Sequence, residues 1–135
     1  MKFAELSLGQ SAQLTKKITD AVVRAFAEVS EDRNPVHLDE AYASQSFFKQ
    51  RIAHGMIGAS LVSAVLGNQL PGEGSIYLGS ELRFKAPVYI DETVTAQVTV
   101  KELKEDKKIV LLDAVVLKED GSVAVEGSAS IKLFS

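Results

Sequence analysis

The chain has 135 residues, a net charge of −3, no cysteine and two histidines. This length fits one domain, so we expect residues 1–135 to form a single domain. The lack of cysteine excludes disulfides and Cys-based zinc sites, and the acidic balance argues against nucleic-acid binding. The most apolar stretch, 55–67, is too short to cross a bilayer, and Met1–Gln10 holds no apolar run typical of a signal peptide. We therefore expect a cytoplasmic protein that binds neither nucleic acid nor membrane and holds no metal.

The first half of the chain shows apolar residues at helical spacing. A helix is predicted over 21–29, and Pro35 ends it, because the residue before a proline is pushed out of the α region. A short helical turn is expected over 39–46. Residues 53–66 are apolar nearly all round, which predicts a helix that is enclosed on most of its sides.

The second half of the chain shows strand spacing instead. Strands are predicted over 76–84, 93–100, 109–117 and 123–133, with a weaker one over 11–18. These strands offer one antiparallel sheet with an apolar face. The simplest packing wraps this sheet around the apolar helix, an α+β arrangement known as the hot-dog fold. The edge strands would need protection, and dimerisation through them is one solution.

Asp32 and His37 lie in the segment that is most informative about function, Ser30–His37. On a continuous helix the two side chains would point roughly 140° apart. Pro35 interrupts such a helix, and a turn can bring a carboxylate and an imidazole together. The pair then supplies an acid and a base with different pKa values, which the movement of two protons requires. The alternative is structural: an aspartate that caps a helix and a histidine on the surface.

The step His54-Gly55 precedes the predicted apolar helix. Gly55 would let a ligand approach the backbone, and its N–H at the positive end of the helix would favour a developing oxyanion. The alternative is that Gly55 only lets the helix pack closely against the sheet. We interpret His54 as a structural residue at the helix start. Ser63 lies two turns further along and could meet a carboxylate such as that of Asp32.

Five segments of the chain form one recognisable pattern: Ser30–Leu38 with Ala43, His54–Met56, Leu70–Gly72, Gly74–Gly79 and Phe84–Val88. This pattern resembles the signature of the R-specific enoyl-CoA hydratases of the MaoC-like group, and it covers almost the whole chain. One departure is Glu31, where many members have glycine before the aspartate. Some single-domain members share the Ser-Glu-Asp form.

The resemblance implies a hot-dog enzyme that adds water reversibly across a trans-2-enoyl-CoA to give an (R)-3-hydroxyacyl-CoA. By match to the motif, Asp32 and His37 would be the catalytic pair, and the N–H of Gly55 would bind the thioester carbonyl. Ser63 and Asn34 would support the pair. No metal or cofactor is implied, because CoA is part of the substrate. Family members usually form homodimers, and single-domain bacterial members often feed fatty-acid β-oxidation intermediates into polyhydroxyalkanoate synthesis.

Two other functions stay open: a hot-dog acyl-CoA thioesterase and a non-catalytic acyl-CoA-binding protein. A thioesterase usually carries an acidic residue on the central helix, and residues 56–66 contain neither Asp nor Glu. A binding protein would need no paired acid and base. The acyl-chain length should depend on the pocket behind the thioester, for which Leu66 and Ile131 are the candidates. The alternative is that both residues belong to the core.

Overall fold

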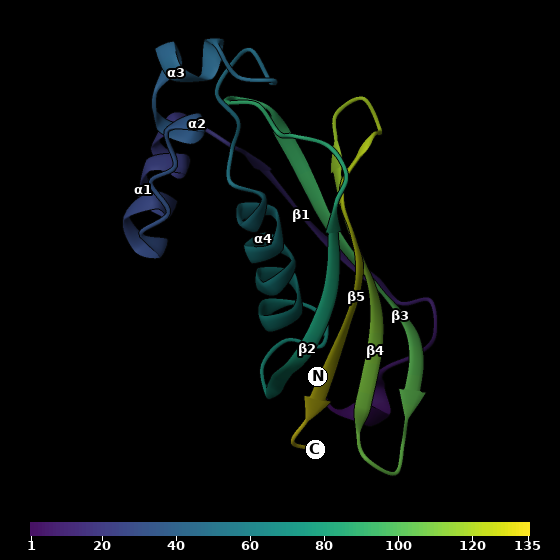
Figure 1. Ribbon diagram of the computed structural model, residues 1–135. Helices are drawn as coiled ribbons and strands as arrows, with labels where there is room; N and C mark the ends of the chain where they lie inside the picture. The colour runs from purple at the N-terminus through teal and green to yellow at the C-terminus, as the bar shows by residue number, and fades with distance from the viewer.

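Five antiparallel strands form one sheet in the computed structural model, which describes residues 1–135 (Figure 1). The spatial order is β1-β3-β4-β5-β2, so β1 and β2 are the edge strands. The strands are β1 (Ser11–Lys17), β2 (Ser75–Phe84), β3 (Thr93–Lys104), β4 (Ile109–Lys118) and β5 (Val123–Leu133). Every neighbouring pair is antiparallel, so short turns suffice to join β3 to β4 and β4 to β5.

One helix, α4 (Gly55–Asn68), lies along the concave face of the sheet (Figure 1). Three shorter helices gather beside its N-terminal end, and a 3₁₀ turn covers Phe3–Glu5. The shorter helices are α1 (Asp20–Ser30), α2 (Pro35–Leu38) and α3 (Glu40–Ser44). None of the helices reaches the length and hydropathy that a bilayer span requires.

The predicted arrangement, an antiparallel sheet wrapped around one central helix, is confirmed. The helix predicted over 53–66 begins at Gly55, and every predicted strand is present. The short helix α2 was not predicted, because four residues are too few to show a period. Pro35 opens this helix as its first residue, a position where the missing N–H of proline has no intrahelical partner to lose.

The core lies between α4 and the sheet. In β3 the alternate residues Val94, Ala96, Val98 and Val100 are buried, as the period of a half-buried strand predicts. From the helix side, residues such as Leu66 are fully buried, and each such side chain contributes about 1.5–3 kcal/mol to stability.

The helix α4 keeps one exposed stripe. Met56 is 57% exposed, and Ser60 and Ser63 are exposed on the same stripe. The sheet curves around the other sides of the helix, but the edge strand β2 is itself largely exposed and does not cover this stripe. The predicted helix, enclosed on most of its sides, is therefore present with one open stripe in the single chain.

Gly127 is required by the close approach of β5 to β2. A Cβ built on this residue would overlap the carbonyl oxygen of Glu81, which belongs to the backbone of the paired strand and cannot swing aside. The twist of the sheet at this point therefore tolerates glycine alone.

We expect Gly127→Ala to destabilise the protein by about 1–3 kcal/mol or more, because the added methyl group forces the two strands apart. Urea unfolding followed by circular dichroism measures the loss. Gly79→Ala in β2 is the matched control, since nothing lies within 4 Å of a Cβ there. Equal stability of the two variants would contradict this account of the strand contact.

Candidate active site

Asp32 lies in a tight turn directly after α1. The helix ends at Glu31, whose φ of 64° is left-handed, a conformation that commonly ends helices and favours glycine. The N–H of Asp32 donates to the hydroxyl of Ser30 at 3.1 Å, and its carboxylate accepts from the N–H of Asn34 at 3.2 Å. These local bonds hold an exposed carboxylate in one orientation.

His37 lies on the short helix α2, which the side chain of Asn34 caps by accepting from the N–H of Val36. The ring is 8% exposed. Its Nδ1 lies 2.8 Å from the carbonyl oxygen of Ile52, an acceptor, so Nδ1 carries the proton. The Nε2 atom makes no hydrogen bond within the chain and is left to meet a ligand.

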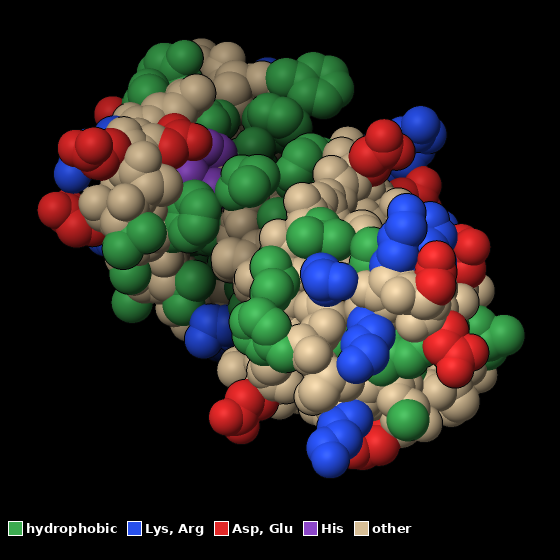
Figure 2. Space-filling view, turned by 90° about the horizontal axis from the view of Figure 1, so that it is seen from below, with side chains coloured by type: hydrophobic (Ala, Val, Ile, Leu, Met, Phe, Trp, Pro, Cys, Tyr) green, Lys and Arg blue, Asp and Glu red, His purple; other side chains and the backbone are tan.

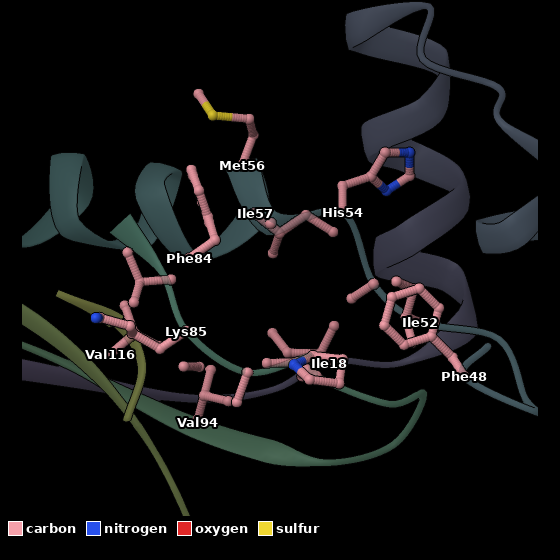
Figure 3. A pocket seen from close by; sticks show the side chains of 18 residues that line it. Ile18, Phe48, Ile52, His54, Met56, Ile57, Phe84, Lys85, Val94 and Val116 are labelled. Carbon is pink, nitrogen blue, oxygen red and sulfur yellow. The ribbon is translucent and has the colours of Figure 1, made fainter. Parts of the chain in front are cut away.

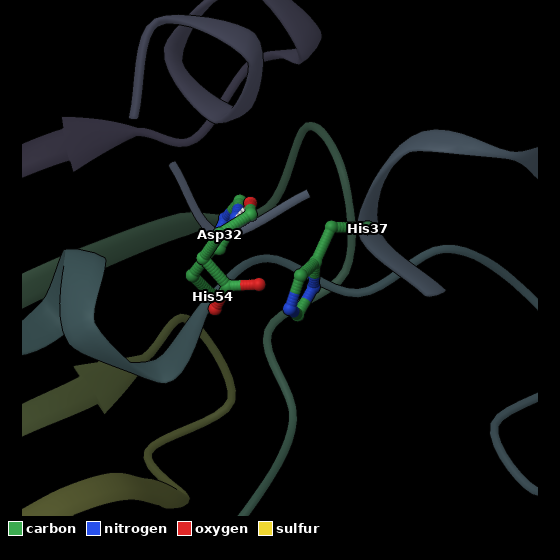
Figure 4. A group of neighbouring side chains, drawn as sticks. All are labelled: Asp32, His37 and His54. Carbon is green, nitrogen blue, oxygen red and sulfur yellow. Dashed lines mark hydrogen bonds between the residues drawn. The ribbon is translucent and has the colours of Figure 1, made fainter. Parts of the chain in front are cut away.

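The structure brings Asp32 and His37 together. One carboxylate oxygen of Asp32 and one ring nitrogen each of His37 and His54 lie within 4.8 Å of one another (Figure 4). The structural alternative differs from the structure in two details: Asn34, not Asp32, caps α2, and His37 is buried rather than on the surface. The catalytic role of the pair stays a prediction. In a view from below, the histidine surface lies in a hollow that hydrophobic and acidic side chains border (Figure 2).

Burial lowers the pKa of the His37 imidazole below its usual value of 6.5, because the charged form loses hydration. The neighbouring His54 and Arg51 also lower this pKa, whereas the bond to the Ile52 carbonyl and the charge of Asp32 raise it. The ring is therefore neutral near pH 7 and can accept a proton at Nε2.

Arg51 holds the backbone around His37, a role that sequence reasoning missed. Its Nε donates to the carbonyl oxygen of His37 at 2.7 Å, and its guanidinium pairs with Asp20 at the start of α1. The side chain is 11% exposed. Asp20 also pairs with Arg24, and the two guanidinium groups hold its pKa below the usual range. No spacing pattern links Arg51 to Asp20, which lies 31 residues away.

Gly55 is the first residue of α4, and its N–H makes no hydrogen bond within the chain. The preceding residue provides no side-chain cap, so the first N–H groups of the helix are available to an anionic oxygen. A Cβ built on Gly55 would lie 2.7 Å from the Phe84 ring. Glycine is therefore needed here for close packing as well, and the two interpretations of Gly55 are compatible.

A cavity of about 470 Å³ adjoins the start of α4 (Figure 3). Most of its lining is hydrophobic, and it includes Gly55, Ile57 and Phe84. Leu66 and Ile131 do not line it, and both are about 1% exposed. The structure thus places these two candidates in the core, and their contact with an acyl chain stays a prediction.

Two further sequence candidates differ in their surroundings. Asn34 contacts the carboxylate of Asp32 through its backbone N–H and caps α2 with its side chain, so it supports the pair from both ends. Ser63 is exposed on α4, and no hydrogen bond joins it to Asp32. Its role stays a prediction.

The cluster of Asp32, His37 and His54 has the residue types of a metal site, but its geometry does not favour one. The two rings stack at 3.9 Å with 28° between their planes. Because a ring nitrogen binds metal within the ring plane, stacked rings do not aim at one ion. In addition, Nε2 of His54 already contacts the carbonyl oxygen of Asp32. The expectation of no metal stays a prediction.

Comparison with known proteins supports the same class. A family model described as a MaoC-like domain matches residues 5–120. The (R)-specific enoyl-CoA hydratase of Aeromonas caviae is 50% identical over 133 residues, which cover 98% of this chain and 99% of that protein. The enzyme of the same name from Rhodospirillum rubrum is 47% identical, over 96% of this chain and 89% of its own length.

Solved structures of hydratases have the same fold as this chain. The (R)-hydratase from A. caviae involved in PHA biosynthesis matches with a TM-score of 0.92 and 51% identity, covering 95% of this chain and 97% of that one. The unliganded R-hydratase from Pseudomonas aeruginosa matches with a TM-score of 0.93 and 43% identity, covering 98% and 84%.

The sheet wrapped around one helix defines a hot-dog protein, and the carboxylate and imidazole beside the start of that helix form its candidate site. The family model covers residues 5–120, and the A. caviae enzyme is 50% identical over 133 residues, so the hot-dog class narrows to one family. The chain belongs to the MaoC-like family.

We expect the His37 ring of the folded protein to titrate below pH 6.5, because burial disfavours its charged form. NMR titration of the ring Cε1 proton measures the midpoint, and His37→Gln assigns the signal. In concentrated urea the midpoint should rise toward the ordinary value. A folded midpoint above the urea midpoint would contradict the effect of burial.

Proposed function

We propose that this protein hydrates trans-2-enoyl-CoA thioesters to (R)-3-hydroxyacyl-CoA. The observation that carries the proposal is the convergence of the Asp32 carboxylate and the neutral His37 ring within 4.8 Å. The relatives named (R)-specific enoyl-CoA hydratase support the reaction and its stereochemistry. By analogy with the A. caviae protein, we also propose that the product supplies PHA biosynthesis.

The first N–H groups of α4 would bind the thioester carbonyl. Attack on C3 of the enoyl group moves the double-bond electrons toward C2 and the thioester oxygen. An oxyanion at this oxygen is stabilised by the free N–H of Gly55 and by the positive end of the helix. The apolar cavity beside Gly55 suits the acyl chain of such a substrate.

Asp32 and His37 then act on the same water molecule. Asp32 holds and polarises the water, and Nε2 of His37 accepts its proton while the oxygen bonds to C3. The same proton passes from His37 to C2, which restores the neutral ring. His37 does not start as an acid, because its lowered pKa leaves it neutral near pH 7. With both groups on one side of the substrate, oxygen and proton add to the same face.

Purified protein should convert crotonyl-CoA with loss of the enoyl absorbance and without release of free thiol. Asp32→Asn and His37→Gln should each lower turnover by about 10²- to 10⁴-fold, because the first removes the carboxylate that polarises the water and the second removes the base that moves its proton. Asp106→Asn, in the turn after β3, is the matched control and should keep full activity.

Each other outcome has a definite meaning. Release of free thiol would indicate a thioesterase, and binding without reaction would indicate an acyl-CoA-binding protein. Full activity in both site variants would overturn the assignment of the pair.

We also propose that the protein is a homodimer joined through β2 and the exposed stripe of α4. Large hydrophobic side chains gather there: Leu78 is 50%, Phe84 53% and Met56 57% exposed. Since β2 is an edge strand with unpaired backbone groups, a second copy can extend the sheet and cover the stripe.

We expect sedimentation velocity to give a mass of about twice 14.6 kDa for the wild type. Leu78→Glu should give monomers, because a charge would be buried against the partner. Val29→Glu is the control, since Val29 is 85% exposed on α1 and outside the proposed interface. A wild-type monomer, or a Leu78→Glu dimer of unchanged affinity, would refute this interface.

A further inference from the structure

His54 is a buried titratable residue that the proposed mechanism does not use. It is 3% exposed and lies at the N-cap position of α4, yet its side chain caps no N–H group of the helix. Its Nδ1 is buried and makes no hydrogen bond. A buried nitrogen without a partner destabilises the fold, so an apolar side chain of similar size would be better as simple filling. The presence of histidine here needs a reason beyond packing.

The other ring nitrogen makes a specific contact. Nε2 lies 2.8 Å from the carbonyl oxygen of Asp32, 22 residues earlier in the chain. A carbonyl only accepts, so Nε2 carries the proton and donates. The Asp32 N–H already donates to the hydroxyl of Ser30. Hydrogen bonds therefore fix both the N–H and the carbonyl of Asp32. Ser30, the partner of the N–H, belongs to the same turn, whereas His54, the partner of the carbonyl, comes from another segment.

The ring face makes a second contact. His54 stacks on His37 with 3.9 Å between the ring centroids, and Phe26 of α1 contacts His54 at 5.0 Å. The stack limits the tilt of the His37 ring about its bond to the Ile52 carbonyl. One side chain thus touches both the backbone of the carboxylate and the ring of the base (Figure 4).

We propose that His54 is a positioning residue that sets the Asp32 carboxylate and the His37 ring at their working separation. The expected effect on turnover rests on the proposed hydratase function. The expected effect on the Asp32 turn rests on geometry alone. His54 contacts no reacting atom in this account. It acts by donating to the Asp32 carbonyl and by stacking on His37.

Two substitutions separate the donor from the ring. His54→Gln keeps an amide N–H that can reach the Asp32 carbonyl but loses the stack. His54→Phe keeps the stack but loses the donor. Phe26→Leu removes the neighbouring ring and serves as the control for general packing, since Phe26 contacts His54 from the side of α1.

We expect His54→Phe to lower kcat for crotonyl-CoA by about 10- to 100-fold, the scale of a small misplacement of catalytic groups, with KM nearly unchanged. His54→Gln should recover a large part of that loss. Phe26→Leu should keep kcat within about threefold of the wild type. Equal losses in His54→Phe and Phe26→Leu at equal urea stability would show a packing role only and overturn the proposal.

Two measurements do not depend on activity. Hydrogen exchange of the Asn34 and Val36 amides, which bond within the Asp32 turn, should accelerate in His54→Phe and less in His54→Gln. Unchanged exchange in both variants would overturn the proposal even if the wild type is an active hydratase. If no enoyl-CoA is hydrated but exchange responds as expected, the proposed function fails and the positioning role of His54 stands.

The wild type provides a test that no unfolded variant can obscure. Long-range ¹H–¹⁵N NMR of the imidazole nitrogens identifies which one is protonated. We expect the neutral His54 ring to carry its proton on Nε2, the nitrogen that faces the Asp32 carbonyl. A proton on Nδ1 alone would mean that the bond to the Asp32 carbonyl does not form, and the proposal would be wrong.

Discussion

Two chain segments form the candidate site, and each contributes an imidazole ring that donates to a backbone carbonyl of the other segment. The His37 ring donates to the carbonyl of Ile52, two residues before His54, and the His54 ring donates to the carbonyl of Asp32. The rings stack between these bonds. Asp32 lies outside the helices, in a turn whose other hydrogen bonds are all local, so the bond from His54 is what ties this turn to the start of α4. The position of the carboxylate relative to α4 therefore depends on this reciprocal pair.

The connection between β2 and β3 determines where the second of these segments lies. Ile52 forms a β-bridge with Tyr89, and the N–H of Ala53 donates to the carbonyl of Val88 at 2.7 Å. These bonds keep the backbone extended up to the helix, so α4 begins at Gly55 and no earlier. The start of α4 is therefore set by backbone pairing of the residues before it, and no side chain caps the helix. Its first N–H groups stay available for an anionic oxygen.

The sequence predicts the long elements and the local motif because both depend on neighbours in the chain. The apolar run of α4 and the alternation in β3 are periodic, and a proline between Asp32 and His37 interrupts a helix that would separate them. The pairing of Arg51 with Asp20 and the bond from His54 to Asp32 join residues 31 and 22 positions apart. No local pattern encodes such contacts. The sequence also does not locate the open stripe of α4, since composition shows how apolar a helix is but not which side its sheet leaves uncovered.

Glu31 shows how a long-range hydrogen bond stabilises a backbone conformation that its own side chain disfavours. Its left-handed conformation costs a residue with a side chain about 1–2 kcal/mol relative to glycine. The turn nevertheless keeps this conformation, because Ser30 and His54 hold the Asp32 peptide groups on both sides. Strain of this kind persists where the surroundings over-determine the backbone, and such places are often functional. A turn held by tertiary bonds can therefore dispense with glycine, and the glutamate in this motif does not argue against a working carboxylate at Asp32.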